Sequence, residues 1–414
     1  NVICLSIFIF FIFFKYSSMK KKIAILGSTG SIGKSLLDII SKDINNFEIV
    51  LLTANKDHRT LIKQAKKFKV KNLILRNFDS SRIAQKKFHK QNVKVFNSFE
   101  DINKIIKKKL DYVMSSIVGV EGLDPTLKII KFTKNIAIAN KESIICGWNL
   151  IENELNKNNT KFIPVDSEHF SLWYGLKNTN IKTIENIYLT ASGGPFNKIP
   201  IKNFKNIKVK TALKHPNWKM GKKISIDSAT MINKVYEVIE AKKIFHISYK
   251  KIKILIHPKS YAHCLLKFQN GMIKIIAHDT TMKIPIFNTL YYDSDNKIKS
   301  KDVDIKNLNN LNFSQVDYKR YPLVNILKFL TEKNSLYETV IVSTNDTLVK
   351  LFLDKKIKFL DISKLMFKFI SSKEFLKYKN ISPKTVKDIV ELNNYVRLNI
   401  LKNVYKFTDV KKTN

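Results

Sequence analysis

Cysteine is scarce in this chain of 414 residues, which contains only Cys4, Cys146 and Cys264. The three lie far apart and form no Cys-x-x-Cys pair, so the sequence predicts neither a thiolate metal site nor a disulfide framework, and a reducing compartment fits. A Walker phosphate-binding loop is also missing, which argues against ATP chemistry. Hydrophobic residues make up an ordinary 44% of the chain, a content that excludes wholesale disorder.

Acidic residues are scarce as well, with 34 against 74 lysines and arginines, and the formal net charge is +40. A charge of this size can indicate a nucleic-acid or anionic-membrane partner. The lysines are spread along the whole chain, however, together with many Asn and Ile residues, as an AT-rich bacterial genome would produce. We therefore expect solvated surface lysines, a cytoplasmic protein and no specific nucleic-acid partner. A polyanion-binding protein is the alternative.

The first 18 residues differ from the rest. Val2 to Phe14 is an apolar run shorter than the ~20 residues that span a bilayer, with neither a basic start nor a clear cleavage site. Met19 runs directly into a predicted strand. We expect translation to start at Met19, with 1–18 as upstream read-through, and no membrane contact for 19–414. A membrane-anchoring leader is the alternative.

Short apolar runs at 23–26, 47–53, 72–75, 112–114 and 136–139 alternate with amphipathic helical patterns up to about Pro164, which predicts a doubly wound parallel sheet. The middle third changes to strands of a mostly antiparallel or mixed sheet, crossed by a helix at 231–244. From Pro322 on, apolar residues recur at helical spacing. The predicted fold is therefore α/β. Its parts are an apolar leader (1–18), a Rossmann-like NADPH-binding domain (19–165), an α+β catalytic and dimerisation domain (166–292), a linker (293–321) and a C-terminal helical bundle (322–414).

A glycine-rich loop follows the first predicted strand. Gly27 permits a tight turn, Gly30 allows the backbone to approach a pyrophosphate, and Gly33 allows the next helix to pack closely. The helix N-terminus would then hold the phosphate. After the second strand, Lys56 and Arg59 favour NADPH, whereas Asp57 argues weakly for NAD.

Three carboxylates indicate a cation site. Asp166 and Glu168, at i and i+2, would lie on one side of an extended segment. Glu237 would complete the site from a helix that also carries Asn233 and Lys234 on the same face. Hard oxygen ligands of this number fit Mg²⁺ or Mn²⁺. The alternative is an acidic surface turn and an ordinary helix glutamate.

Two further segments are candidates for substrate contacts. The glycine turn Ser192–Phe196 is either a phosphate site or a plain turn, and 214–221 has the composition of a loop that closes over a substrate, with Trp218 as its large aromatic. Ser228 could simply cap the following helix. His257 and His263 have no partner spacing and are interpreted as structural.

The motifs, in this order and spacing, resemble those of the 1-deoxy-D-xylulose 5-phosphate reductoisomerase family, from Met19 to the C-terminus. They are GSTGSIG (27–33), NKES (140–143), DSEH (166–169), SGGPF (192–196), KHPNWKMG (214–221), DSATMINK (227–234) and EVIEA (237–241), with weaker support from HPKS (257–260). Asn55 and Val235-Tyr236 depart from residues common in the family.

The resemblance implies a V-shaped homodimer with an NADPH domain, a catalytic domain and a helical bundle in each subunit. It implies that the carbon skeleton of a sugar phosphate is isomerised by retro-aldol and aldol steps and then reduced by NADPH to 2-C-methyl-D-erythritol 4-phosphate, in the non-mevalonate isoprenoid pathway. The cation would be Mg²⁺ or Mn²⁺, with Co²⁺ as a further candidate.

Carried over residue by residue, the resemblance implies a role for each matching position. The metal ligands are Asp166, Glu168 and Glu237, and the catalytic residues are Lys141, Glu168 and His215. Substrate contacts come from Ser167, Ser192, His215, Trp218, Ser228, Asn233, Lys234 and Glu237. NADPH contacts come from Thr29, Gly30, Ser31, Ile32, Asn55, Lys56, Asp57, Asn140, Glu142 and Gly221. The alternative is a Rossmann oxidoreductase without a metal step, such as a semialdehyde or homoserine-type dehydrogenase. Such an enzyme would remain active when a chelator removes divalent ions.

Overall fold

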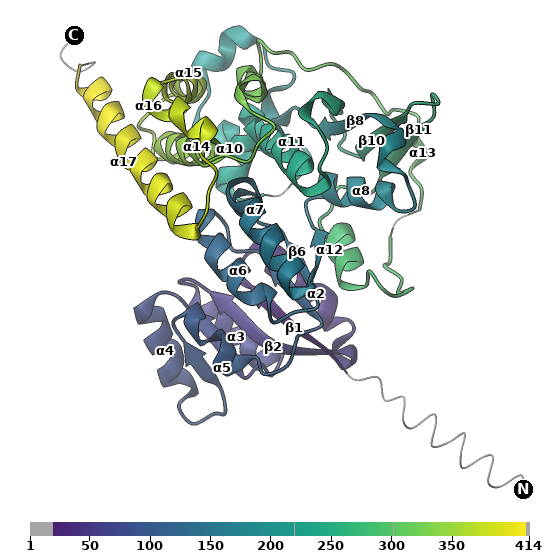
Figure 1. Ribbon diagram of the computed structural model, residues 1–414, viewed down its shortest axis with the longest axis vertical. Helices are drawn as coiled ribbons and strands as arrows, with labels where there is room; N and C mark the ends of the chain where they lie inside the picture. Colours follow the sequence, from purple (N-terminus) through teal and green to yellow (C-terminus); the bar gives the residue numbers. More distant parts are fainter. Residues whose placement is uncertain (1–19, 219, 301, 411–414) are drawn as a thin grey trace, which may run out of the picture.

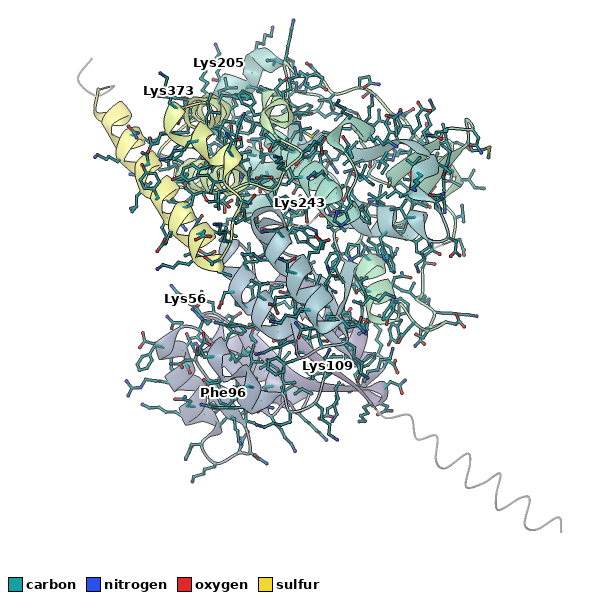
Figure 2. All side chains as sticks on the ribbon, viewed as in Figure 1. Lys56, Phe96, Lys109, Lys205, Lys243 and Lys373 are labelled. Carbon is teal, nitrogen blue, oxygen red and sulfur yellow. The ribbon has the colours of Figure 1, made fainter. Side chains whose placement is uncertain are left out.

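A computed structural model describes residues 20–218, 220–300 and 302–410 of the chain (Figure 1). The expectations for 1–18 and for a start at Met19 lie outside the described residues. Within those ranges, no helix has both the length and the apolar character needed to cross a membrane. Figure 2 shows Lys56, Lys109 and Lys373 on well-separated parts of the described molecule.

A seven-stranded parallel sheet organises the N-terminal part, in the order β4-β3-β2-β1-β5-β6-β7. The strands are β1 (Lys21–Leu26), β2 (Phe47–Ala54), β3 (Asn72–Leu75), β4 (Lys94–Phe96), β5 (Tyr112–Ser115), β6 (Asn135–Ile138) and β7 (Lys161–Pro164). The predicted doubly wound sheet is confirmed, and its order reverses between β1 and β5. Ligands of such sheets bind at the carboxyl ends of the strands beside this reversal.

Helices cover both faces of this sheet. One face packs against α2 (Ser31–Ser41), α3 (His58–Lys67) and α4 (Phe78–Phe88), and the other against α6 (Leu123–Ile130) and α7 (Lys141–Asn158). The helix α12 (Lys283–Leu290) comes from much later in the chain and packs beside α2 through Ile286 and Leu290 (Figure 1). Tertiary contacts thus join the segment around α12 to the nucleotide-binding fold.

The middle of the chain forms a four-stranded mixed sheet, as predicted, in the order β11-β10-β8-β9. Its strands are β8 (Ile184–Ala191), β9 (Ile252–Ile256), β10 (Ala262–Phe268) and β11 (Ile273–Ala277), with only β8 and β9 parallel. The helices α8 (Ser167–Leu176) and α11 (Ile232–Phe245) contact this sheet. They bring the predicted acidic residues to it from the end of β7 and from the far end of α10 (Lys222–Thr230).

The C-terminal part is helical, as predicted. It contains α14 (Tyr337–Leu353), α15 (Phe359–Ile370), α16 (Lys373–Leu376) and α17 (Val386–Val410), preceded by the 3-10 helix η8 (Pro322–Phe329). Apolar side chains of α14 share one buried core with α7 and α11. The bundle is therefore packed directly against the helices that carry the predicted site.

Candidate active site

The glycine loop lies between β1 and α2. Gly27 has φ +80°, and a Cβ there would come within 2.8 Å of the Ser116 carbonyl oxygen. A Cβ at Gly33 would lie 2.5 Å from the Cα of Ser28, so only glycine lets α2 approach the loop this closely. Gly30 is different, because it is exposed and its Cβ position meets only the Gly27 carbonyl oxygen, at 3.3 Å.

This open position fits a pyrophosphate. Gly30 is the N-cap of α2 and offers no side chain to the first N–H groups of the helix, which belong to Ser31 and its neighbours. Unpaired N–H groups and the helix dipole attract phosphate. The loop therefore fits the phosphates of a dinucleotide, with Thr29, Ser31 and Ile32 around them.

Asn55, Lys56 and Asp57 follow β2 and are exposed. The Asp57 carboxylate caps α3 by accepting a hydrogen bond from the Thr60 N–H at 3.0 Å. Burial acts to raise the pKa of Asp57, but the bonds from Thr60 prevail and lower it. The carboxylate that argued for NAD is thus bound to the backbone of its own helix, and Lys56 remains exposed beside it.

Asn140 and Glu142 lie at the start of α7. Asn140 is its N-cap, accepting from the Ser143 N–H at 3.0 Å, and its amide donates to the carbonyls of Ile117 and Gly119 in the loop after β5. Glu142 turns away and pairs with the ammonium group of Lys223 at 2.6 Å. Asn140 therefore shapes the cofactor-side loop, and the Glu142 carboxylate is paired with Lys223.

The three predicted metal ligands meet. Ligand oxygens of Asp166, Glu168 and Glu237 all lie within 4.8 Å of one another. The expected extended segment is wrong, because Asp166 is the N-cap of α8 and accepts from the Glu168 N–H at 3.2 Å. A capping carboxylate folds back over the first turn of its helix. That local geometry, rather than strand alternation, brings Asp166 and Glu168 to one side.

Two buried lysines interleave with these carboxylates. Lys141 Nζ lies 3.0 Å from Asp166 Oδ2 and 2.8 Å from Asn233 Oδ1. Lys234 pairs with Glu168 Oε1 at 3.2 Å and also with Glu237. Asn233 Nδ2 donates to Glu237, so the predicted shared face of α11 is confirmed. The side chain of Glu237 is only 2% exposed, and the site therefore concentrates charge out of water.

The pKa values of two carboxylates in the site are shifted in opposite directions. Burial raises the pKa of Glu237 to about 8 in spite of Lys234, and the negative charges of Glu168 and Asp166 add to the shift. Burial also acts to raise the pKa of Glu168, but Lys234 and His263 bring it well below its usual range. A divalent cation would relieve the crowding of the three carboxylates, and their hard oxygens suit Mg²⁺. The residues present therefore fit a metal site.

Ser192 and His215 form a hydrogen-bonded pair. Ser192 follows β8 and begins a turn in which Gly193 and Gly194 have φ of +78° and +61°. The Nδ1 atom of His215 accepts the backbone N–H groups of Asn217 at 3.1 Å and Trp218 at 3.0 Å. The proton therefore sits on Nε2, which donates to Ser192 Oγ at 3.0 Å. Burial lowers the pKa of His215 to about 4, which keeps the ring neutral.

This arrangement leaves the Ser192 hydroxyl as a donor. Its oxygen accepts from His215 and from the Gly194 N–H at 3.0 Å, so its own proton can point to an anion. Ser228 is close by, because a Cβ on Gly194 would meet the Ser228 carbonyl oxygen at 2.8 Å. The alternative role for Ser228, capping of the following helix, is wrong, since Ser228 lies in the last turn of α10 and Met231, with φ +65°, precedes α11.

Comparison with known proteins agrees with this geometry. Residues 23–147 match the family 1-deoxy-D-xylulose 5-phosphate reductoisomerase, 162–245 its C-terminal domain, and 279–399 a further DXP reductoisomerase C-terminal domain. A curated relative from Pelagibacter ubique, named 1-deoxy-D-xylulose 5-phosphate reductoisomerase, is 58% identical over 92% of this chain and 98% of its own. The chain belongs to this reductoisomerase family.

Other relatives of the reductoisomerase family support the same assignment. A protein of that name from Clostridium novyi is 37% identical over 94% of this chain and all of its own. The reductoisomerase from Zymomonas mobilis in complex with NADPH superposes with a TM-score of 0.84, at 30% identity, over 93% of this chain and 99% of that one. A reductoisomerase in complex with NADPH, fosmidomycin and magnesium gives 0.85 at 29% identity, over 94% and 99%.

Sequence reasoning missed His169 and Glu240, although both lie inside motifs of the reductoisomerase family. His169 Nε2 donates to the Glu237 carbonyl oxygen at 2.8 Å, and its Nδ1 lies 3.5 Å from Asp166 Oδ1 and 3.7 Å from Glu240 Oε2. Each follows a predicted metal ligand by three residues on its helix, a spacing that places it on the same face. That spacing was the available signal. His169 ties α8 to α11 behind the carboxylates.

His263 was interpreted as structural, but it lies beside the site. Its Nδ1 is 3.9 Å from Glu168 Oε1, its ring stacks on His278 with centroids 3.9 Å apart, and Trp218 meets it edge-on at 6.3 Å. Trp218 is half-buried, as its polar neighbours predicted. No spacing in the sequence links these side chains, because they come from β10, the segment after β11 and the 214–221 loop.

Proposed function

We infer that this chain is an oxidoreductase that converts 1-deoxy-D-xylulose 5-phosphate to 2-C-methyl-D-erythritol 4-phosphate with NADPH and a divalent cation. The observation that carries the inference is the meeting of Asp166, Glu168 and Glu237 with two buried lysines, in a chain 58% identical to a reductoisomerase. Related structures that contain NADPH and magnesium support the same cofactors. The product places the activity in isoprenoid precursor synthesis.

Two sets of residues would hold the cofactors. The N–H groups of Ser31 and Ile32 would face the pyrophosphate of NADPH, which supplies the hydride when bound. Asp166, Glu168 and Glu237 would hold the cation, which supplies Lewis-acid polarisation of substrate oxygens when bound. The remaining NADPH contacts are proposed at Thr29, Gly30, Asn55, Lys56, Asp57, Asn140, Glu142 and Gly221.

The chain's own residues would orient the sugar phosphate. The Ser192 hydroxyl, prepared as a donor by neutral His215, would bind the phosphate end together with Ser228 and Asn233. Lys141 Nζ, held 3.0 Å from Asp166, keeps protons that it can donate to a neighbouring substrate oxygen. Trp218 on the 214–221 loop would cover the site and exclude water. Lys141, Glu168 and His215 are the proposed catalytic residues, with Ser167, Lys234 and Glu237 as further substrate contacts.

A homodimer built on β11 is part of the proposal. This strand is at the edge of its sheet, and its residues Ile273 and Ile275 are exposed by 55% and 43%, as is Met272 just before it, by 64%. Ile273 and Ile275 point to the same face because side chains alternate along a strand. An apolar edge strand with free backbone groups is ready to pair. Since the isolated chain leaves this edge open to water, we propose that a second copy covers it.

The proposal extends to compartment and surface charge. Cys146 and Cys264 are buried free thiols among the described residues, which supports a reducing compartment such as the cytoplasm. The dispersed lysines of Figure 2 support a charged surface without a specific nucleic-acid partner. The proposed domain boundaries near 165 and 321 follow the change of sheet after β7 and the start of the helical part, and the proposed boundary near 292 follows the end of α12.

The decisive experiment is NADPH oxidation by the purified chain, followed at 340 nm on addition of 1-deoxy-D-xylulose 5-phosphate. Oxidation should require Mg²⁺ or Mn²⁺ and stop in excess chelator, and the product should be 2-C-methyl-D-erythritol 4-phosphate. Turnover that persists in the chelator would favour a metal-free Rossmann oxidoreductase. Absence of oxidation with substrate and either metal would refute the proposed function.

A further inference from the structure

Lys223 joins three carboxylates outside the metal site. Its ammonium nitrogen lies 2.6 Å from Glu142 Oε1, 2.8 Å from Asp227 Oδ2 and 3.0 Å from Asp346 Oδ1. The side chains of Glu142 and Asp227 are only 7% and 1% exposed. The ring of Tyr236 lies on another side, 5.2 Å from the same nitrogen. The ammonium group of Lys223 is thus shared by residues of α7, α10, α11 and α14.

Three of these contacts are next in sequence to proposed site residues. Glu142 follows Lys141, Asp227 precedes Ser228, and Tyr236 precedes Glu237. Lys223 itself stands two residues after Gly221, at the end of the 214–221 loop. A shift of any of these helices relative to Lys223 would therefore move a side chain of the active site. The distances between the active-site side chains therefore depend on the contacts that hold Glu142, Asp227 and Tyr236 around Lys223.

The fourth contact comes from the C-terminal helical part. Asp346 is on α14, and its neighbour Asn345 donates to Asp227 Oδ1 at 2.8 Å. Neither is among the proposed substrate, metal or cofactor residues. Burial acts to lower the pKa of Lys223, but the three carboxylates prevail and raise it well above its usual range. Without its charge, three carboxylates would repel one another in a poorly hydrated place.

We propose that Lys223 is a positioning residue. Its ammonium group binds Glu142, Asp227 and Asp346 together and so fixes the relative positions of the helices that carry the active-site side chains. Through Asp346 it makes the C-terminal helix α14 part of the catalytic unit. The inference rests on the proposed function for its activity readout. It goes beyond that function because neither Lys223 nor Asp346 is among the residues proposed to contact substrate, metal or cofactor.

The test compares Lys223→Met with Lys223→Arg and with Lys222→Met, which removes the same charge at the exposed neighbouring position. Steady-state kcat and KM for 1-deoxy-D-xylulose 5-phosphate, Mn²⁺ binding by electron paramagnetic resonance, and the melting temperature are measured for each. Lys223→Met should lose about 10- to 100-fold in kcat/KM and bind Mn²⁺ more weakly, as for residues that orient metal ligands. Lys223→Arg should recover most of the loss, and Lys222→Met should match the wild type.

A second pair of variants covers the case in which Lys223→Met does not fold. Asp346→Asn should lower kcat/KM by about 2- to 30-fold, the range of remote coupling. The control variant is Asp354→Asn. Asp354 is the C-cap of the same helix, α14, but it pairs with Lys350 at the surface, so its substitution should have no effect on kcat/KM. Equal kcat/KM for these two variants would overturn the proposal, as would a Lys223→Met enzyme that changes only in melting temperature.

Failure of the proposed function can be told apart from failure of this inference. If the wild type does not oxidise NADPH with substrate, the proposed function is refuted, and Mn²⁺ binding then decides the role of Lys223. Weaker Mn²⁺ binding in Lys223→Met than in Lys222→Met supports the positioning role. Equal binding refutes it.

Discussion

Gly33→Ala tests whether the glycine loop is held by backbone packing. The added methyl group would lie 2.5 Å from Ser28 Cα, 2.7 Å from the Gly27 carbonyl oxygen and 2.7 Å from the Ser28 carbonyl oxygen. All three are backbone atoms, so no flexible side chain can give way. Helix α2 or the loop must move instead.

Two effects of opposite sign decide the magnitude. Alanine in a helix is favoured over glycine by about 1 kcal/mol. Overpacking typically costs about 1–3 kcal/mol, and more where nothing can relax. With three backbone contacts under 3.0 Å, the upper end applies, and we expect a net loss of about 2 kcal/mol. For a domain-sized transition this lowers the melting temperature by about 4–8 °C.

Gly30→Ala is the matched control, because its Cβ would meet only the Gly27 carbonyl oxygen at 3.3 Å and Gly30 has an ordinary extended conformation. We expect an unchanged melting temperature but NADPH binding at least about tenfold weaker, or ~1.4 kcal/mol, because the methyl group fills the pyrophosphate's place. Gly33→Ala should lose both stability and NADPH affinity. Calorimetry and fluorescence titration measure the two properties. A Gly33→Ala protein as stable as the wild type, or a Gly30→Ala protein that binds NADPH normally, would refute the reasoning.

Three further outcomes are expected. Glu237→Gln should lose about 100-fold or more in turnover while still binding NADPH, because the variant lacks the most deeply buried of the three proposed carboxylate ligands. Full activity of this variant in a chelated assay would contradict the metal assignment. His215→Gln should raise KM for the sugar phosphate by about tenfold, because the hydrogen bonds of His215 to Ser192 and to the loop backbone are lost and together contribute at least ~1 kcal/mol. A change confined to kcat would speak against a role of His215 at the phosphate end. If the proposed dimer forms through β11, Ile275→Lys should convert it to a monomer in light scattering with little change in the melting temperature of the subunit, because a charge on the β11 edge blocks pairing. A dimer that persists in this variant would exclude that edge as the interface.

The local chain pattern determined the fold class and the cofactor loop. Short apolar runs ending in Gly or polar residues gave β1, β2, β3, β5 and β6, because burial of a parallel strand requires apolar side chains on both faces. The two edge strands, β4 (Lys94–Phe96) and β7 (Lys161–Pro164), were not predicted, since an edge strand is only partly buried and needs few apolar residues. The spacing of Gly27, Gly30 and Gly33 predicted their separate roles, because backbone approach depends on the absence of a Cβ within a single turn.

The sequence also predicted which carboxylates form the acidic site, although it did not predict how the chain brings them together. Asp166 and Glu168 come together as a helix cap and its first turn, which depends on where β7 ends and α8 begins. The motif spacing identified the candidate ligands, but only the packing of α8 against α11 set the distances between their oxygens.

Other parts of the site were decided by tertiary structure alone. His263 and His278 stack although 15 residues and a strand separate them, and Lys223 collects carboxylates from positions 142, 227 and 346. Periodicity reports which face of one element is buried, whereas these contacts depend on how several helices pack in space. The sequence by itself therefore determined the elements, the nucleotide loop and the candidate ligands. The tertiary structure decided which distant charges meet, because a buried charge is stable only where folding supplies its partner.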